Sequence, residues 1–149
     1  MNGYGELLKY IQDFLVKDGI VKTINHADIF ERDSHNENKF PLINIVPIGI
    51  TFDESITIFN IDVECLMQRD LRKDVKHRDE YKLNDNLVDN LNTTYAVLRR
   101  LFEHLKRSDV FTVELLGTGT PIIYKNKNTL DGWSFSFNIE YSEIEVDVC

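Results

Sequence analysis

The stretch that decides the fold is Gly132–Cys149, which reads GWSFSFNIEYSEIEVDVC. In its first half, apolar side chains alternate with Ser, Asn and Glu, and the apolar positions are Trp133, Phe135, Phe137, Ile139 and Tyr141. Successive side chains of a strand point to opposite faces, so this pattern predicts a half-buried strand with one apolar and one polar face. We therefore expect a sheet that is covered on one face only.

A second strand of the same kind is predicted at Phe59–Met67, where apolar residues again alternate with polar ones. Its polar positions include Asp62 and Glu64, and the strand at the end of the chain contributes Glu140. The polar sheet face is therefore expected to carry these three carboxylates and to present a negative potential to whatever passes it.

Two segments have the three- and four-residue apolar spacing of amphipathic helices. The first is Tyr4–Leu15, and Gly19 follows where such a helix would stop. The second and longer one begins near Asn84–Asn86, where several residues could cap it, and its apolar stripe runs from Leu87 to Leu105.

The remaining strands are predicted from apolar runs at 20–29, 40–50, 110–116 and 121–125. Pro41 and Pro47 interrupt the second of these, so that strand is expected either at an edge or bulged near Pro47. The order α-β-β-β-α-β-β-β predicts an α+β fold. It is a two-layer sandwich with a largely antiparallel or mixed sheet and both helices on one face. At 149 residues, the chain is the size of one domain, spanning 1–149.

The glycine-rich stretch Gly117–Thr120 raises the possibility of a phosphate-binding loop. It lacks the Lys-Ser/Thr pair of a P-loop, and Pro121 follows where a helix should begin. We therefore predict a hairpin turn at this place.

No catalytic residue, metal ligand or cofactor site is expected from the motifs. The segment His77–Glu80 has metal-ligand residue types, but it lies in a run of mixed charge with no organised ligand set. Asp62 and Glu64 could resemble an acid–base pair, yet no apolar pocket is evident that would shift either pKa. Cys65 and Cys149 have no disulfide or zinc spacing and are expected to be reduced thiols.

The composition is acidic, with a formal net charge of −8 and a pI of about 4.9. Such a balance argues against a free-standing nucleic-acid binder and against docking on anionic lipid. No signal peptide and no membrane span are expected from the sequence.

A run of mixed charge at about 69–82 is expected to form an exposed arm. Two interpretations remain open: a solvated loop, or a segment that orders against a neighbouring subunit and sets the register of that contact. The basic residues proposed for such a contact are Arg69, Arg72, Lys73, Lys76 and Arg78.

Four stretches, taken in order, resemble a family of tailed-bacteriophage proteins, the tail-completion or tail-terminator-like proteins of the head–tail junction. They are Phe40–Ile45, Ile58–Val63, Asn84–Leu105 with the basic end up to Arg107, and Gly132–Glu140 with the terminal Asp147–Cys149. Together they cover most of the chain.

This resemblance implies a non-catalytic structural virion protein that assembles in the host cytoplasm into a ring of six or twelve subunits. The ring would contact neighbouring neck and tail-tube proteins and surround the channel through which DNA passes without specific binding. Asp62, Glu64 and Glu140 would then be candidates for an acidic channel lining, which repels phosphate. The alternative is another non-catalytic interaction module, such as a phage assembly chaperone; a small enzyme is a third possibility.

Overall fold

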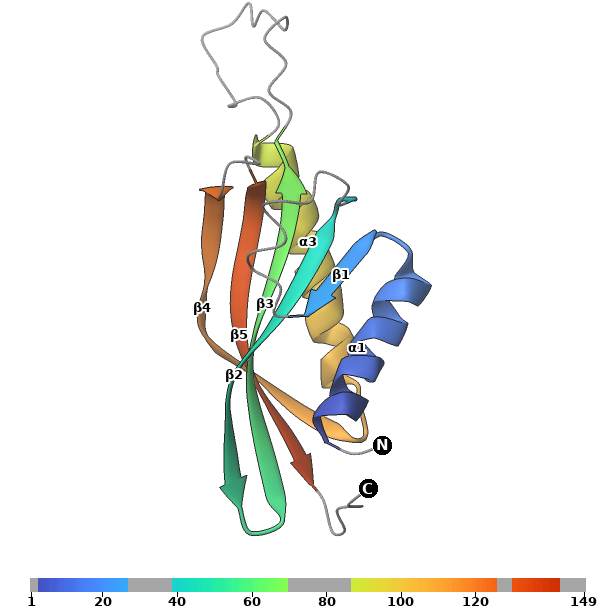
Figure 1. Ribbon diagram of the computed structural model, residues 1–149, viewed down its shortest axis with the longest axis vertical. Helices are drawn as coiled ribbons and strands as arrows, with labels where there is room; N and C mark the ends of the chain where they lie inside the picture. The colour runs from blue at the N-terminus through green and yellow to red at the C-terminus, as the bar shows by residue number, and fades with distance from the viewer. Residues whose placement is uncertain (1–2, 27–38, 70–86, 126–129, 143–149) are drawn as a thin grey trace, which may run out of the picture.

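The computed structural model describes residues 3–26, 39–69, 87–125 and 130–142, and Figure 1 shows their arrangement. The elements follow one another as α1 (Tyr4–Asp18), β1 (Thr23–His26), β2 (Leu42–Asp53), β3 (Ile56–Gln68), α3 (Leu87–Lys106), β4 (Phe111–Lys125) and β5 (Leu130–Ser142). The strands form one five-stranded sheet in the order β1-β2-β3-β5-β4. Both helices lie on the same face of this sheet (Figure 1).

Helix α1 forms where the apolar stripe predicts it, and it buries Leu7, Ile11 and Leu15 against the sheet. It ends at Gly19, which has the left-handed conformation (φ 77°) and donates its backbone N–H to the carbonyl oxygen of Leu15. Glycine has no Cβ to clash in this conformation, so it terminates the helix at low cost.

Helix α3 is the longer helix and also agrees with the predicted stripe. It places Val97, Leu98, Leu101 and Leu105 against the sheet, and the side chains of Asn90 and Thr94 are buried near its beginning. The helix packs over β3, β5 and β4, while α1 packs beside it. The buried aliphatic side chains of both helices meet Ile61, Val63, Phe137 and Ile139 from the sheet in one core.

The sheet is mixed, because β1 pairs with β2 in parallel and all other pairs are antiparallel. Strand β1 reaches only as far as Ile45 of β2, so among the residues that the structure describes β2 is an edge strand from Val46 onward. The β2–β3 register shifts between Pro47 and Gly49. Both interpretations of Pro47, edge and bulge, therefore hold, as expected for a residue that cannot donate to a ladder.

The prediction of a hairpin turn at Gly117–Thr120 is wrong. These residues lie within β4, and the pairing with β5 continues on both sides of them, with Leu116 opposite Ser136 and Thr120 opposite Ser134. Four steps along β4 match two along β5, so the irregularity adds two residues to β4. Gly117 takes a positive φ of 66°, and glycine inside a strand is as typical of a bulge as of a turn.

The expectation that one sheet face is bare is also wrong at one end of the sheet. Leu42, Leu66 and Leu130 form a second apolar cluster and are fully buried. The register places Leu42 and Leu66 on the face opposite the helices, two positions from Asn44 and Glu64, which are also buried. The sheet is therefore covered on both faces where β2, β3 and β5 lie near this cluster.

The predicted fold class is confirmed: the chain is an α+β two-layer sandwich with two helices on one face of a mixed, mainly antiparallel sheet. The predicted order α-β-β-β-α-β-β-β is recovered when the two halves of β4 are counted separately. Among the residues that the structure describes, no helix has both the length and the apolar character needed to cross a membrane.

Candidate assembly surface

Arg69, the first basic residue of the predicted contact arm, is buried. Its guanidinium donates Nε and Nη2 to the two carboxylate oxygens of Asp131, each at 2.8 Å, and the two side chains are 1% and 0% exposed. Asn90 of α3 donates to Asp131 at 3.4 Å and to the carbonyl oxygen of Gln68 at 3.3 Å. Arg69 therefore fixes the end of β3 to β5 and α3 and is not available to a partner.

The other four predicted contact residues of the arm lie outside the described residues. They are Arg72, Lys73, Lys76 and Arg78, and the same is true of His77–Glu80. The proposal that this segment contacts a neighbouring subunit therefore stays a prediction.

The three carboxylates predicted on one sheet face do share that face. Asp62 and Glu64 are two residues apart on β3, and Glu140 lies opposite Ile58 of the same strand. Glu64 is six positions along β3 from Ile58, so at a rise of about 3.3 Å per residue the three groups spread over roughly 20 Å. They form a dispersed row and not a compact cluster.

Only two of these carboxylates are accessible. Asp62 and Glu140 are partly exposed, and Asp62 accepts a hydrogen bond from the hydroxyl of Ser136. Glu64 is only 7% exposed and accepts a hydrogen bond from Nδ2 of Asn44 at 3.1 Å. Glu64 is therefore a buried structural group, and its expected place on an open channel surface is wrong.

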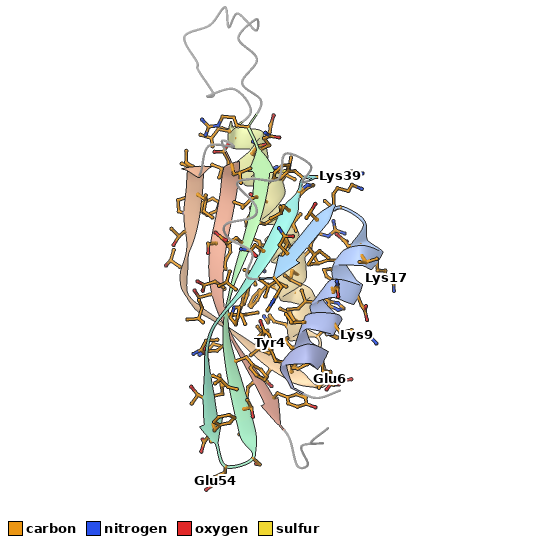
Figure 2. All side chains as sticks on the ribbon, viewed as in Figure 1. Tyr4, Glu6, Lys9, Lys17, Lys39 and Glu54 are labelled. Atoms are coloured by element: carbon orange, nitrogen blue, oxygen red, sulfur yellow. The ribbon has the colours of Figure 1, made fainter. Side chains whose placement is uncertain are left out.

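A surface that the sequence prediction missed lies on the outer half of β2, Val46–Asp53. Ile48, Ile50 and Phe52 are 59%, 52% and 76% exposed there. This is also the part of β2 that β1 does not pair with. The β2–β3 hairpin extends past the beginning of α1 (Figure 1), and Glu54 marks its tip (Figure 2). The alternation of Ile48, Ile50 and Phe52 is visible in the sequence, but such a pattern predicts ordinary core. The sequence does not show that the β2–β3 hairpin extends past the beginning of α1.

The opposite edge of the sheet is formed by β4, and an apolar groove lies beside it. The groove has a volume of about 110 Å³ and lies between α3 and the sheet. Its lining is mainly aromatic and aliphatic: Tyr95, Leu98, Arg99, Phe102, Leu115, Phe135 and Phe137. Tyr95 is 51% exposed at its mouth.

A second groove runs between the two helices and contains His104. The imidazole ring stacks on Phe14 with 4.1 Å between ring centroids and on Tyr10 with 4.8 Å. Desolvation, followed by the nearby positive charges of Arg107 and Lys17, lowers the pKa of His104 below its ordinary value. Burial and the two nearby cations therefore favour the neutral form of the ring.

Burial raises the pKa of the Cys65 thiol far above its ordinary value, so the buried thiol of β3 is not a nucleophile. In the parts of the chain that the structure describes, no three side chains of His, Cys, Asp or Glu come together as a potential metal site.

Comparison of the sequence with protein-family models and with curated proteins gave no match.

Proposed function

We propose that this chain is a structural virion protein of a tailed bacteriophage that assembles into a ring at the head–tail junction, as a tail-completion, tail-terminator or neck-connector subunit. Its partners in this proposal are further copies of itself, in rings of six or twelve, and the adjacent neck and tail-tube proteins. DNA passes through the ring without specific binding.

The observation that carries the assembly part of this proposal is the exposed apolar half of β2. A strand edge offers unpaired backbone N–H and C=O groups, and proteins that remain monomeric protect such edges with charged residues, Pro or bulges, or cover them. Pro47 and the register shift next to it interrupt the first part of this edge, but 49–52 carry neither Pro nor a charge. Residues 46–53 contain one charged side chain, Asp53, and no Lys or Arg. An edge of this kind is typical of a surface that another chain covers.

The phage part of the proposal has a different basis, which is the resemblance of four ordered stretches of the sequence. The α+β sandwich is the fold that this resemblance implies. The charge of −8 is compatible with a channel through which phosphate must slide, and Asp62 and Glu140 are the accessible carboxylates that could face it.

Two measurements test the proposal. Size-exclusion chromatography with light scattering, followed by negative-stain imaging, should show rings; a compact monomer or dimer would favour an assembly chaperone or another interaction module. The neighbouring genes provide the independent test, since genes for a portal, a tail tube and a tape measure are expected beside this one. A neighbourhood without any such gene would contradict the phage assignment.

A further inference from the structure

The two open edges of the sheet differ in a complementary way. The outer half of β2 carries exposed apolar side chains without a cover, whereas the groove between α3 and β4 is an apolar hollow without a side chain to fill it. In the strand order β1-β2-β3-β5-β4, β4 is the last strand on one side, and on the other side β2 is the edge beyond Ile45, where the short strand β1 does not reach.

The exposed side chains and the groove also lie on the same face of the sheet. The register places Ile50 opposite Phe59, and Phe52 opposite Thr57, on the face that Phe59 shares with the helices. On β4 the corresponding positions are Val113 and Leu115, whose partners on β5 belong to or pack against the same core. A strand placed beside β4 with the same face toward α3 would therefore bring its apolar side chains to the groove.

The strand directions permit this pairing. Three successive antiparallel pairs connect β2 to β4 through β3 and β5, so β2 and β4 run in opposite directions. When one copy is set beside another with the same face toward the same side, β2 of the first lies antiparallel to β4 of the second. The sheet can thus continue from copy to copy without inverting a subunit.

We propose that the outer half of β2 in one copy of this chain pairs with the free edge of β4 in a second copy, and that Ile50 and Phe52 of the first copy enter the groove between α3 and β4 of the second. The contact is heterologous, because two different surfaces meet, and such contacts close into rings or extend into filaments. The inference rests on the self-assembly proposed above and names the surfaces that make it.

Charge at the rim agrees with this orientation. The tip of the β2–β3 hairpin carries Asp53 and Glu54, and α3 ends in Lys106, followed by Arg107, close to the beginning of β4. All four side chains are exposed. Opposite charges at the rim of an interface set orientation more than affinity.

Pairing of β2 with β2 across a two-fold axis is the competing arrangement. It would also cover the free edge, but it would leave the groove beside α3 empty and Tyr95 at its mouth without a partner. The groove is the feature that distinguishes the two arrangements, and variants on each side of the contact separate them.

The test uses two single variants of the full chain, Phe52→Lys on the β2 side and Tyr95→Lys on the groove side. Their controls are Val16→Lys and Val88→Lys, which place lysine at apolar positions that are 69% and 52% exposed on the two helices. Circular dichroism and thermal unfolding verify that each variant is folded, and sedimentation velocity gives the dissociation constant of assembly. Each interface variant is expected to weaken assembly by roughly thirtyfold or more, as for a central anchor, while the controls assemble like the parent chain.

Mixing the two variants provides the decisive result. Phe52→Lys retains an intact groove and Tyr95→Lys retains an intact β2 edge, so the mixture should form a one-to-one dimer that neither variant forms alone. Loss of assembly in Phe52→Lys with normal assembly in Tyr95→Lys would show β2–β2 pairing and overturn the inference. Rings unaffected by either variant would overturn it while leaving the proposed function intact, and so would a chain that stays monomeric at millimolar concentration although portal and tail genes lie beside its gene.

Discussion

At the residue scale, the Arg69–Asp131 pair is the contact whose loss should destabilise the fold most. Replacing Arg69 with Ala removes the bidentate guanidinium from the fully buried Asp131 carboxylate, which is expected to lower the free energy of unfolding by about 3–5 kcal/mol. Urea denaturation measures the loss. The matched control is Arg99→Ala, which breaks an ion pair on α3 whose side chains are 58% and 36% exposed. That change should cost less than about 1 kcal/mol.

The double variant Arg69→Met, Asp131→Leu separates charge from packing at this site. It removes both charges together, and it is expected to be more stable than Arg69→Ala, because the buried carboxylate is removed along with the guanidinium that it binds. Equal destabilisation by Arg69→Ala and Arg99→Ala would contradict the structural role assigned to Arg69.

The burial of Arg69 could not be predicted from the sequence. Arg69 is the first residue of a charged run, and its neighbours in that run have the same composition. Its partner Asp131 is 62 residues away along the chain and becomes a neighbour only because β5 pairs with β3. A local charge pattern carries no information about such a contact, so the predicted exposure of Arg69 was wrong.

Gly132 is a second position at which one atom decides stability. A Cβ at this residue would lie 1.8 Å from the carbonyl oxygen of Cys65 in the adjacent strand β3. Backbone cannot move aside like a flexible side chain, so Gly132→Ala should cost about 3 kcal/mol or more in unfolding free energy. Gly49→Ala is the control, since its nearest atom would be the Asn60 amide nitrogen at 3.5 Å. Thermal unfolding of both variants checks this; a Gly132→Ala protein as stable as Gly49→Ala would contradict the close approach of the strands.

At the element scale, the helices and the one-sided strands were predictable because their patterns are local. The stripes of α1 and α3 and the alternation of Phe59–Met67 and Trp133–Tyr141 appear in the structure with small changes of boundary. The turn predicted at Gly117–Thr120 was wrong because turns and bulges share the same residues, and only the partner strand decides between them. The exposed half of β2 was missed for a related reason: its alternation is local, but its burial depends on where α1 begins.

The packing of α3 against α1 through His104 gives the stability a defined pH dependence. The pKa of His104 is lower in the folded chain than the ordinary value of 6.5, so below that value the unfolded chain binds more protons than the folded one. Stability from this group is therefore complete above about pH 6.5 and is lost as the pH falls through the interval down to the folded pKa. His104→Phe keeps an aromatic ring between Tyr10 and Phe14 and removes the titration.

Denaturation curves of the parent chain and of His104→Phe between pH 8 and pH 5 measure this difference. The parent should lose more stability than the variant over that range, because the contributions of all other titrating groups are common to both. A parent chain whose stability falls no more steeply than that of His104→Phe would show that the ring is protonated equally well in the folded and unfolded states.

At the scale of the whole molecule, the sheet has two accessible edges, and its far face is buried only at one end. The helices cover one face, and the Leu42, Leu66 and Leu130 cluster with Asn44 and Glu64 is buried on the other. Among the described residues, the β2 edge, the β4 edge and the part of the far face that carries Asp62 and Glu140 are accessible surfaces of the sheet. A ring built through the edges would leave that face free to line a channel.

Assembly of several copies is opposed by the repulsion between their negative charges. Two copies with a formal charge of −8 repel each other over the width of a domain. Taking their centres about 35 Å apart in water, screening by the Debye length lowers this repulsion by roughly 2 kcal/mol between 10 mM and 150 mM salt. The proposed contact itself is mainly apolar, with few ion pairs that salt could weaken. We therefore expect sedimentation at constant pH to show roughly thirtyfold tighter assembly in 150 mM NaCl than in 10 mM NaCl.

A variant with fewer charges away from the contact tests this explanation. Asp13→Asn with Asp89→Asn changes two exposed carboxylates on the helices and reduces the formal charge from −8 to −6. Because the repulsion scales with the product of the two charges, the salt dependence of assembly should fall to roughly half of its parent value in free-energy units. Assembly that instead weakens as NaCl is added would mean that ion pairs hold the copies together. In that case the apolar contact between Phe52 and the groove beside α3 would not be the main source of affinity.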